Sequence, residues 1–184
     1  MTATVSDQQL KQMLSDPKTM RKGFELVVRQ YSEQLYWQIR RIVVSHDDAD
    51  DVLQNTFLKA WNALSSFHGD SKLLTWLSRI AINESLDFVR KQKNVVMTST
   101  DDGELGLANQ LMADDYFDGN ETEAQLQEAI AGLPEVQRAV FNMRYFEEMK
   151  YSEMSKVLGT SEGALKASYH IAVNKVSDFF HRKD

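Results

Sequence analysis

The sequence predicts an all-α protein with two small helical domains joined by an acidic, flexible linker. Only two of the 184 residues are Pro and eight are Gly, so residues that break helices are rare. Apolar residues recur at three- and four-residue spacing over most of the chain, which is the pattern of amphipathic helices. One central stretch lacks this periodicity and is rich in Asp and Gly, which is typical of a linker.

In the first domain, residues 1–94, we expect three helices after a polar, loosely helical start. Apolar spacing predicts the first helix over about 24–42. Acidic residues at 47 and 48 suit the first turn of the second helix, where the macrodipole favours negative charge. That helix is expected to bury a stripe formed by Ala49, Val52, Leu53, Phe57, Ala60, Trp61 and Leu64. A third helix is predicted from about 72 to 93, with Asp70 or Ser71 as its N-cap.

Residues 95–121 are the predicted linker, with a short helical turn near 107–112. The second domain, residues 122–184, starts with a short helix that Gly132 ends. Pro134 is tolerated in the first turn of the next helix, which is expected to reach about residue 146.

Residues 151–176 have the length and the turn of a helix-turn-helix. Ser152 is expected to cap the first helix, Gly159 to end it and Ser161 to cap the second, which runs to about residue 180. Recognition helices place their N-terminal residues on base edges, so the DNA-contacting candidates include Glu162, Lys166 and His170. An ordinary helical hairpin with a solvated face is the alternative interpretation.

The composition narrows the class of protein. The chain has no Cys, which excludes disulfides and thiolate metal sites. It shows no secretory signal at its N-terminus, and no apolar run approaches the ~20 residues of a membrane span. We therefore expect a cytoplasmic protein.

The net charge of −6 is unevenly distributed. Residues 98–123 contain eight acidic residues and no Lys or Arg, and the remainder of the chain carries a charge of +2. Neutralisation of phosphates supplies most non-specific DNA affinity. If the protein works on DNA, another component therefore has to supply the positive charge.

The acidic start of the second helix has two interpretations. Carboxylate clusters bind hard cations, but the spacing of a calcium loop with its Gly at the sharp turn is missing, so we expect a solvated helix start and no metal. Leu58 lies on the polar face of this helix. An apolar side chain among carboxylates and amides suits a surface for a protein partner, although a single exposed Leu is also ordinary.

Aromatic and basic residues are interleaved along the third helix and the loop before it. A single strand of nucleic acid needs rings that stack on unpaired bases and cations that follow its phosphates. Phe67 and Trp76 are also expected to place most of each ring in the core. Asn83 is a weak helix former that pairs well with base edges. The cations in this stretch are Lys72, Arg79, Arg90, Lys91 and Lys93.

Together, these motifs resemble the small extracytoplasmic-function (ECF) sigma factors of bacterial RNA polymerase. The resemblance covers roughly residues 24–93 and 126–180. Four blocks carry it: Asp48-Ala49-Asp50-Asp51-Val52-Leu53-Gln54 followed by Phe57-Leu58-Lys59-Ala60-Trp61; Phe67-His68-Gly69-Asp70-Ser71 leading to Thr75-Trp76-Leu77-Ser78-Arg79-Ile80-Ala81-Ile82-Asn83 and Leu86-Asp87; Leu133-Pro134-Glu135-Val136-Gln137-Arg138-Ala139-Val140-Phe141; and Tyr151-Ser152-Glu153-Met154.

The resemblance implies a sigma region 2 bundle and a region 4 helix-turn-helix. Region 2 would bind the coiled coil of the polymerase β′ subunit through Asp48, Asp51, Gln54 and Leu58. The loop 67–74 and the helix after it would capture an unstacked base and hold the melted −10 strand through Phe67, Lys72, Trp76, Arg79, Asn83 and Arg90. Region 4 would contact the polymerase β flap, and would bind the −35 element through Ser161, Glu162, Gly163, Lys166, His170 and Lys175.

The chain departs from the family pattern at four places. Leu73-Leu74 stand where many members have Phe-Arg, so the melting loop lacks a ring and a cation. Asn55 replaces a usual Glu, and Glu148 replaces a usual Gly. The last helix lacks several Arg residues, so we expect an atypical −35 preference, a weaker contact, or a greater dependence on His170 and Lys175.

The resemblance implies a transcription initiation factor that performs no chemistry and needs no cofactor or metal. Its partners would be core RNA polymerase, promoter DNA and an anti-sigma factor, and the acidic linker would pass near the RNA exit path. A free-standing DNA-binding regulator is one alternative, but it leaves residues 48–61 unexplained. An enzyme is another, although the four His are scattered and no phosphate loop is present. A sigma-like antagonist or adaptor is the third.

Overall fold

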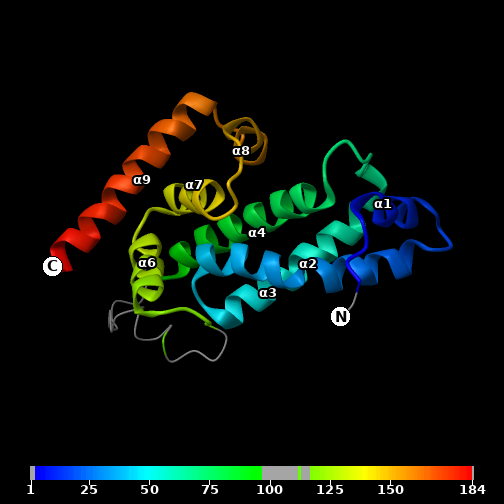
Figure 1. The fold of residues 1–184 in the computed structure, drawn as a ribbon, viewed down its shortest axis with the longest axis horizontal. Coiled ribbons are helices and arrows are strands. Elements are labelled where there is room, and N and C mark those ends of the chain that lie inside the picture. The colour runs from blue at the N-terminus through cyan, green and yellow to red at the C-terminus, as the bar shows by residue number, and fades with distance from the viewer. Residues whose placement is uncertain (1–2, 97–111, 113–116, 184) are drawn as a thin grey trace. The chain divides into compact units, whose positions relative to one another are not determined.

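The computed structural model describes residues 3–96, 112 and 117–183, and every regular element in these ranges is helical (Figure 1). The all-α prediction is therefore confirmed. The chain folds into two compact units, residues 1–85 and 86–184. The elements are α1 (Asp7–Ser15), α2 (Met20–Val43), α3 (His46–Asn62), the 3-10 turn η1 (Leu64–Ser66), α4 (Leu73–Val96), α6 (Glu121–Ala131), α7 (Glu135–Tyr145), α8 (Tyr151–Leu158) and α9 (Glu162–Lys183).

Helix α1 overturns the prediction of a loosely helical start. Ser6 accepts a hydrogen bond from the Gln9 amide, and the Gln9 side chain accepts one from the Ser6 amide. This reciprocal capping box satisfies two amides that the helix itself leaves unpaired. Leu10 and Leu14 are buried, and α1 packs against α2. A Cβ on Gly23 would lie 2.8 Å from the Met13 Cβ, so the helices approach closely there.

The first unit surrounds a core of fully buried aliphatic residues, which include Leu35, Ile39 and Leu77. The predicted stripe of α3 is confirmed at Ala49, Val52 and Ala60, which are buried. The prediction is wrong for Trp61, which is 38% exposed and packs edge-on against Phe24 at 5.1 Å between ring centroids. Thr56, which was not predicted in the stripe, is buried, and its hydroxyl is satisfied by donating to the Val52 carbonyl at 2.7 Å.

The N-terminus of α4 is also capped differently from the prediction. The Leu73 amide donates to the Asp7 carboxylate at 2.9 Å, and no hydrogen bond joins Asp70 or Ser71 to this helix among the described contacts. The cap comes from another helix, so no local sequence signal could have revealed it.

In the second unit, Asn120 and Glu123 form a capping box at the start of α6. Arg138 of α7 donates to the Ala131 and Leu133 carbonyls at 2.7 and 3.1 Å, and burial lowers the pKa of its guanidinium. These bonds hold the corner between α6 and α7. The core beneath α9 consists of Ala129, Ile130, Leu133, Phe141, Ala172 and Val176.

Two of the three predicted helix ends around the helix-turn-helix are confirmed. Gly159 ends α8 in the left-handed conformation, with φ 66°, and Ser161 accepts a hydrogen bond from the Ala164 amide at 3.3 Å. The prediction for Ser152 is wrong, because α8 begins at Tyr151 and its N-cap position, Lys150, makes no side-chain cap. Of the expected turn at 107–112, only residue 112 is described, and it is helical; most of the expected linker lies outside the described residues.

Candidate polymerase and nucleic-acid interfaces

The acidic motif occupies the outer face of α3. The Asp48 amide donates to Ser45 at 3.5 Å, which caps the helix. Asp51 and Gln54 are exposed, Asp48 is half-buried, and Leu58 is 62% exposed. The opposite face is buried against the core, so this orientation of α3 is set by packing. The four predicted polymerase contacts therefore lie along one helix face, and an apolar side chain ends the row.

A polar cluster that sequence reasoning missed holds the turn before this face. Arg40 donates to the Val44 carbonyl at 2.9 Å and to the Tyr36 hydroxyl at 2.7 Å. The Tyr36 oxygen lies 2.6 Å from Nδ1 of His46, the first residue of α3. Because Arg40 can only donate, the Tyr36 O–H is available to donate to His46. Tyr36 and Arg40 belong to α2, so only the packing of α2 against α3 brings the three side chains together.

The backbone of this turn is strained. Val44 has φ 77° and ψ −47°, and the Ser45 amide donates to the Val43 carbonyl at 3.0 Å. Together these define a γ-turn of the rare, strained form. A positive φ is a genuine outlier for a β-branched residue. The bond from Arg40 to the Val44 carbonyl therefore braces a conformation that the local sequence does not favour.

The residues predicted for the −10 strand cluster at the loop before α4 and along that helix. The Phe67 and Trp76 rings are half-buried, with centroids 4.7 Å apart, as expected for rings that are partly in the core. Lys72, Arg79 and Asn83 are exposed and recur at the spacing of one helix face. Arg90 is exposed further along α4, 3.8 Å from Asp87.

A cleft of about 890 Å³ adjoins this loop. One side consists of α1 residues, and the other of the end of α3, η1 and the loop itself. Gly69 has φ 77° at the loop's centre, a conformation that Gly adopts without strain. The lining includes Gln8, Lys11, Gln12, Trp61, Asn62, Phe67 and His68. The cleft therefore combines aromatic walls with amide and imidazole groups.

In the second unit, the start of α9 presents the predicted −35 residues. Glu162, Gly163, Lys166 and His170 are all exposed and lie within one helix face. Leu165, Ala172 and Val176 are buried on the other side. At 100° per residue, Lys175 projects from the side of α9 opposite to Lys166. Its amine donates to Gln137 of α7 at 2.9 Å. The structure therefore does not bring Lys175 to the face that holds Lys166.

An aromatic residue of α8 supports the basic residue of this face. The Lys166 amine lies 5.6 Å from the centroid of the Tyr151 ring, and the Arg144 guanidinium lies 5.0 Å from it. Cations are attracted to the faces of aromatic rings at such distances. Sequence reasoning missed Tyr151 and Arg144, although Tyr151 belongs to a motif that resembles the family.

The structure also explains the unusual residue at position 148. Glu148 has φ 49°, in the left-handed region where Gly has no steric cost. This accounts for the Gly that the family pattern has here.

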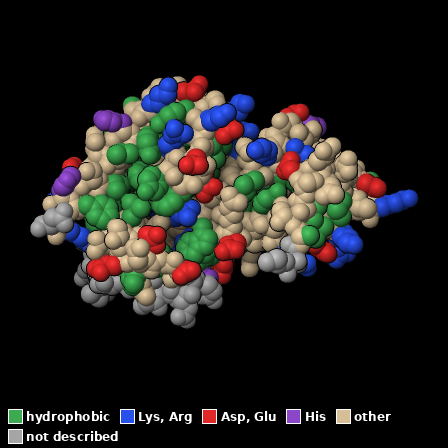
Figure 2. Space-filling model, in the orientation of Figure 1, with side chains coloured by type: hydrophobic (Ala, Val, Ile, Leu, Met, Phe, Trp, Pro, Cys, Tyr) green, Lys and Arg blue, Asp and Glu red, His purple; other side chains and the backbone are tan. Residues whose placement is uncertain are grey.

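Hydrophobic side chains gather on the surface around α7 and α9 (Figure 2). The large exposed hydrophobic residues of these helices are Val136, Tyr145, Ile171 and Val173. In the ranges that the structure covers, no three His, Asp or Glu side chains come together as metal ligands. None of the helices described is both long and apolar enough to cross a membrane.

The comparisons match both domains. The Sigma-70 region 2 family matches residues 27–95, and the Sigma-70, region 4 family matches residues 123–176. The RNA polymerase sigma-H factor of Pseudomonas aeruginosa is 30% identical over 88% of this chain and 86% of its own length. The ECF RNA polymerase sigma factor SigW of Bacillus subtilis is 29% identical over 83% of this chain and 88% of its own length.

The sigma factor RpoE, in its co-crystal structure with the anti-sigma factor NepR from Bartonella quintana, shares the fold. Its TM-score is 0.66, and 87% of this chain and 98% of that chain are covered at 22% identity.

These findings define the class of protein as a factor that starts transcription without catalysing a reaction. The chain belongs to the sigma-70 family of RNA polymerase sigma factors, in its extracytoplasmic-function group. It binds core RNA polymerase and directs promoter recognition, promoter melting and transcription initiation.

Proposed function

We propose that residues 1–94 form sigma region 2, residues 95–121 an acidic linker and residues 122–184 sigma region 4, in a protein that works in the cytoplasm. The family matches at 27–95 and 123–176 support these boundaries. The charge of only +2 outside residues 98–123 fits this function, because core polymerase would supply the general affinity for DNA.

The outer face of α3 is the contact for the polymerase β′ coiled coil. The observation that carries this assignment is the exposure of Asp51, Gln54 and Leu58 on a helix whose other face is buried. A rim of polar groups beside an apolar anchor is the usual composition of a protein interface. The carboxylates also favour a basic partner through electrostatic complementarity.

The loop 67–72 and α4 hold the melted −10 strand. Phe67 and Trp76 offer ring surface for an unpaired base, and Lys72, Arg79 and Arg90 offer cations for phosphates, as binding of single strands requires. Asn83 is exposed on the same helix, and its amide can pair with a base edge.

The start of α9 binds the −35 element in the major groove. Glu162, Gly163, Lys166 and His170 are exposed there, and Ser161 caps the helix. Lys166 approaches DNA with its position set by Tyr151. Lys175 lies outside this face, so its contribution is to phosphates at most.

An anti-sigma factor is the expected negative regulator. The apolar side chains exposed on α7 and α9 are available to a protein partner, since the cores of protein interfaces are enriched in aromatic and other apolar residues. The similar sigma factor RpoE is in complex with an anti-sigma factor, which supports this expectation.

Binding to purified bacterial core RNA polymerase, followed by transcription from genomic fragments with and without the protein, tests the function. Stable binding with new, defined start sites is the expected result. Absence of binding together with tight duplex binding by the protein alone would instead indicate a free-standing regulator. Binding without transcription would indicate an antagonist.

A further inference from the structure

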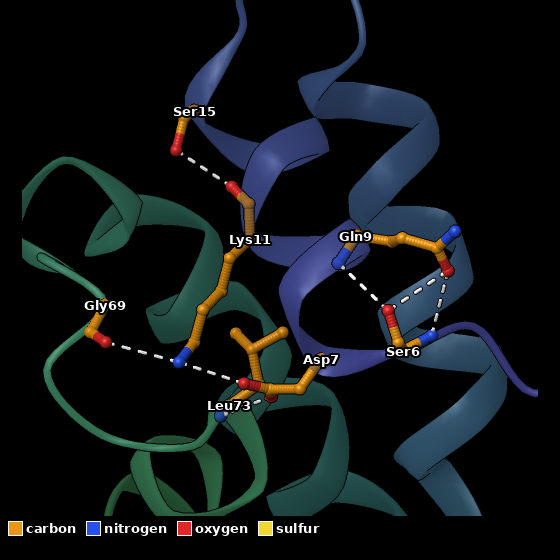
Figure 3. Close-up of polar contacts among 7 residues, drawn as sticks. All are labelled: Ser6, Asp7, Gln9, Lys11, Ser15, Gly69 and Leu73. Atoms are coloured by element: carbon orange, nitrogen blue, oxygen red, sulfur yellow. Dashed lines mark hydrogen bonds and ion pairs between the residues drawn. The ribbon is translucent and has the colours of Figure 1, made fainter.

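Helix α1 contacts the loop before α4 through a charged network (Figure 3). The Lys11 amine lies 2.9 Å from one carboxylate oxygen of Asp7 and donates to the Gly69 carbonyl at 3.2 Å. The other Asp7 oxygen accepts from the Leu73 amide at 2.9 Å. The Lys11 and Asp7 side chains are only 25% and 34% exposed, so these bonds lie largely away from solvent.

The network holds the loop at two points. Gly69 is at its centre, where the backbone has φ 77°, and Leu73 is the first residue of α4. The first amides of a helix have no partner within the helix, so Asp7 caps α4 from a position 66 residues away. The Lys11 amine also lies 5.9 Å from the centroid of the Phe67 ring. Each contact restrains a residue expected to hold the melted strand or one adjacent to it.

The cleft beside this loop has α1 as its second wall. Gln8, Lys11 and Gln12 line it from α1, opposite Trp61, Asn62 and His68. Amide groups can pair with base edges, and rings can stack on base faces. No sequence motif assigns a function to α1, yet this helix supplies polar groups and a cation beside a loop whose Leu73-Leu74 replaces the usual Phe-Arg.

We infer that α1 is part of the promoter-melting site, with Asp7 and Lys11 as positioning residues that hold the loop 67–72 in the form that accepts an unpaired base. This inference rests on the proposed role of the loop in base capture. Asp7 and Lys11 act through Leu73 and Gly69, and their loss weakens binding of the melted strand without weakening the contact of α3 with polymerase.

The test uses holoenzyme assembled from core polymerase and full-length protein carrying Asp7→Ala or Lys11→Met. The probe is a single-stranded oligonucleotide that copies the non-template −10 region of a promoter mapped with the wild-type protein. We expect each variant to bind it about tenfold more weakly, the scale of a lost hydrogen bond to a charged group. Affinity for core polymerase should change less than about twofold, because α3 is untouched.

Two control variants separate positioning from helix stability and from net charge. Ser6→Ala removes the cap of α1 but keeps the Asp7 and Lys11 side chains. Lys18→Met removes one exposed positive charge from the same unit. Both controls should bind the oligonucleotide like the wild type. An equal loss in Ser6→Ala would overturn the inference, because stability of α1 alone would then explain it.

Coupling and rescue sharpen the result. The double variant Asp7→Ala/Lys11→Met should lose less affinity than the two single losses combined, because Asp7 and Lys11 are paired in one network. Lys11→Arg keeps a cation that can bridge Asp7 and Gly69, and it should restore most of the affinity. If Asp7→Ala does not fold, Asp7→Asn replaces it, since this change keeps an acceptor for Leu73 and removes only the charge that pairs with Lys11.

Failure of the proposed base capture and failure of the positioning role give different results. If wild-type holoenzyme transcribes the promoter but does not bind the oligonucleotide, base capture by the loop is wrong and the inference fails with it. If the wild type binds and the α1 variants bind equally well, the loop keeps its function and only the positioning role is overturned.

Discussion

The loop expected to hold a melted strand and the helix face expected on duplex DNA are stabilised by contacts of different range. In the first unit, the loop is held by Asp7 and Lys11, which lie 66 and 58 residues from their backbone partners. In the second unit, the start of α9 depends on near neighbours, because Ser161 caps it and Gly159 ends the preceding helix. Local motifs therefore indicate a helix-turn-helix, whereas a loop of this kind depends on the whole fold around it.

The largest expected effect tests whether the two units unfold independently. Leu35 and Leu165 are both buried, one in each unit, and Leu→Ala changes at such sites cost about 2–5 kcal/mol. All three Trp residues lie in the first unit, at 37, 61 and 76. In urea, Leu35→Ala should lower the midpoint seen by Trp fluorescence, and Leu165→Ala only the helical signal of the second unit. An equal shift of the Trp signal in Leu165→Ala would show that the units unfold as one.

The next effect concerns the polymerase-facing surface of the first unit. Asp51→Arg reverses an exposed charge on α3 and should weaken binding to core polymerase by about thirtyfold, the scale of a lost interfacial charge pair. Glu33→Arg, at an exposed position of α2, is the matched control and should leave affinity unchanged. The Trp unfolding midpoint should stay the same in both variants. Normal affinity in Asp51→Arg would remove this face from the interface.

The DNA-facing surface of the second unit gives a smaller effect. Lys166→Ala should lower −35-dependent initiation about tenfold, the scale of a single DNA contact. Tyr151→Leu should lower it less, since it removes only the ring beside the Lys166 amine. Lys175→Ala tests whether Lys175 contacts the −35 element, as the sequence pattern predicts. The structure predicts a small effect, because the Lys175 amine donates to Gln137. A larger loss in Lys175→Ala than in Lys166→Ala would mean that the recognition face is wrongly assigned.

The smallest effects are expected at the two non-Gly residues with positive φ among those described, Val44 in the first unit and Glu148 in the second. A left-handed backbone costs a non-Gly residue about 1–2 kcal/mol, against a chain-entropy cost for Gly of about 0.5–1 kcal/mol. Both Val44→Gly and Glu148→Gly should therefore raise the free energy of unfolding slightly. The gain should be larger at Val44, which is β-branched. Urea midpoints measure both, and a lowered midpoint would show that the strain is already relieved by neighbours.

Much of the helical organisation was predictable, and the exceptions share a cause. Ser161 and Gly159 act within a few residues of themselves, and both were predicted. Trp61 was predicted in the buried stripe, but its ring packs edge-on against Phe24 of α2 and stays partly exposed, a contact between helices that periodicity does not reveal. The sequence contains the capping-box pattern of α1, Ser6 followed three residues later by Gln9. It was not predicted because the segment is mostly polar.

The sequence by itself determined the helix content, the helix-turn-helix and the exposed face of α3, because periodicity and caps act over one or two turns. The resemblance of its motifs indicated the sigma family, which the comparisons established. Only the tertiary structure decided which α2 side chain contacts His46, which ring supports Lys166, and that α1 caps α4. These contacts join residues from different helices, and a hydrogen bond or ring contact between such residues depends on how the helices pack, which no local pattern encodes.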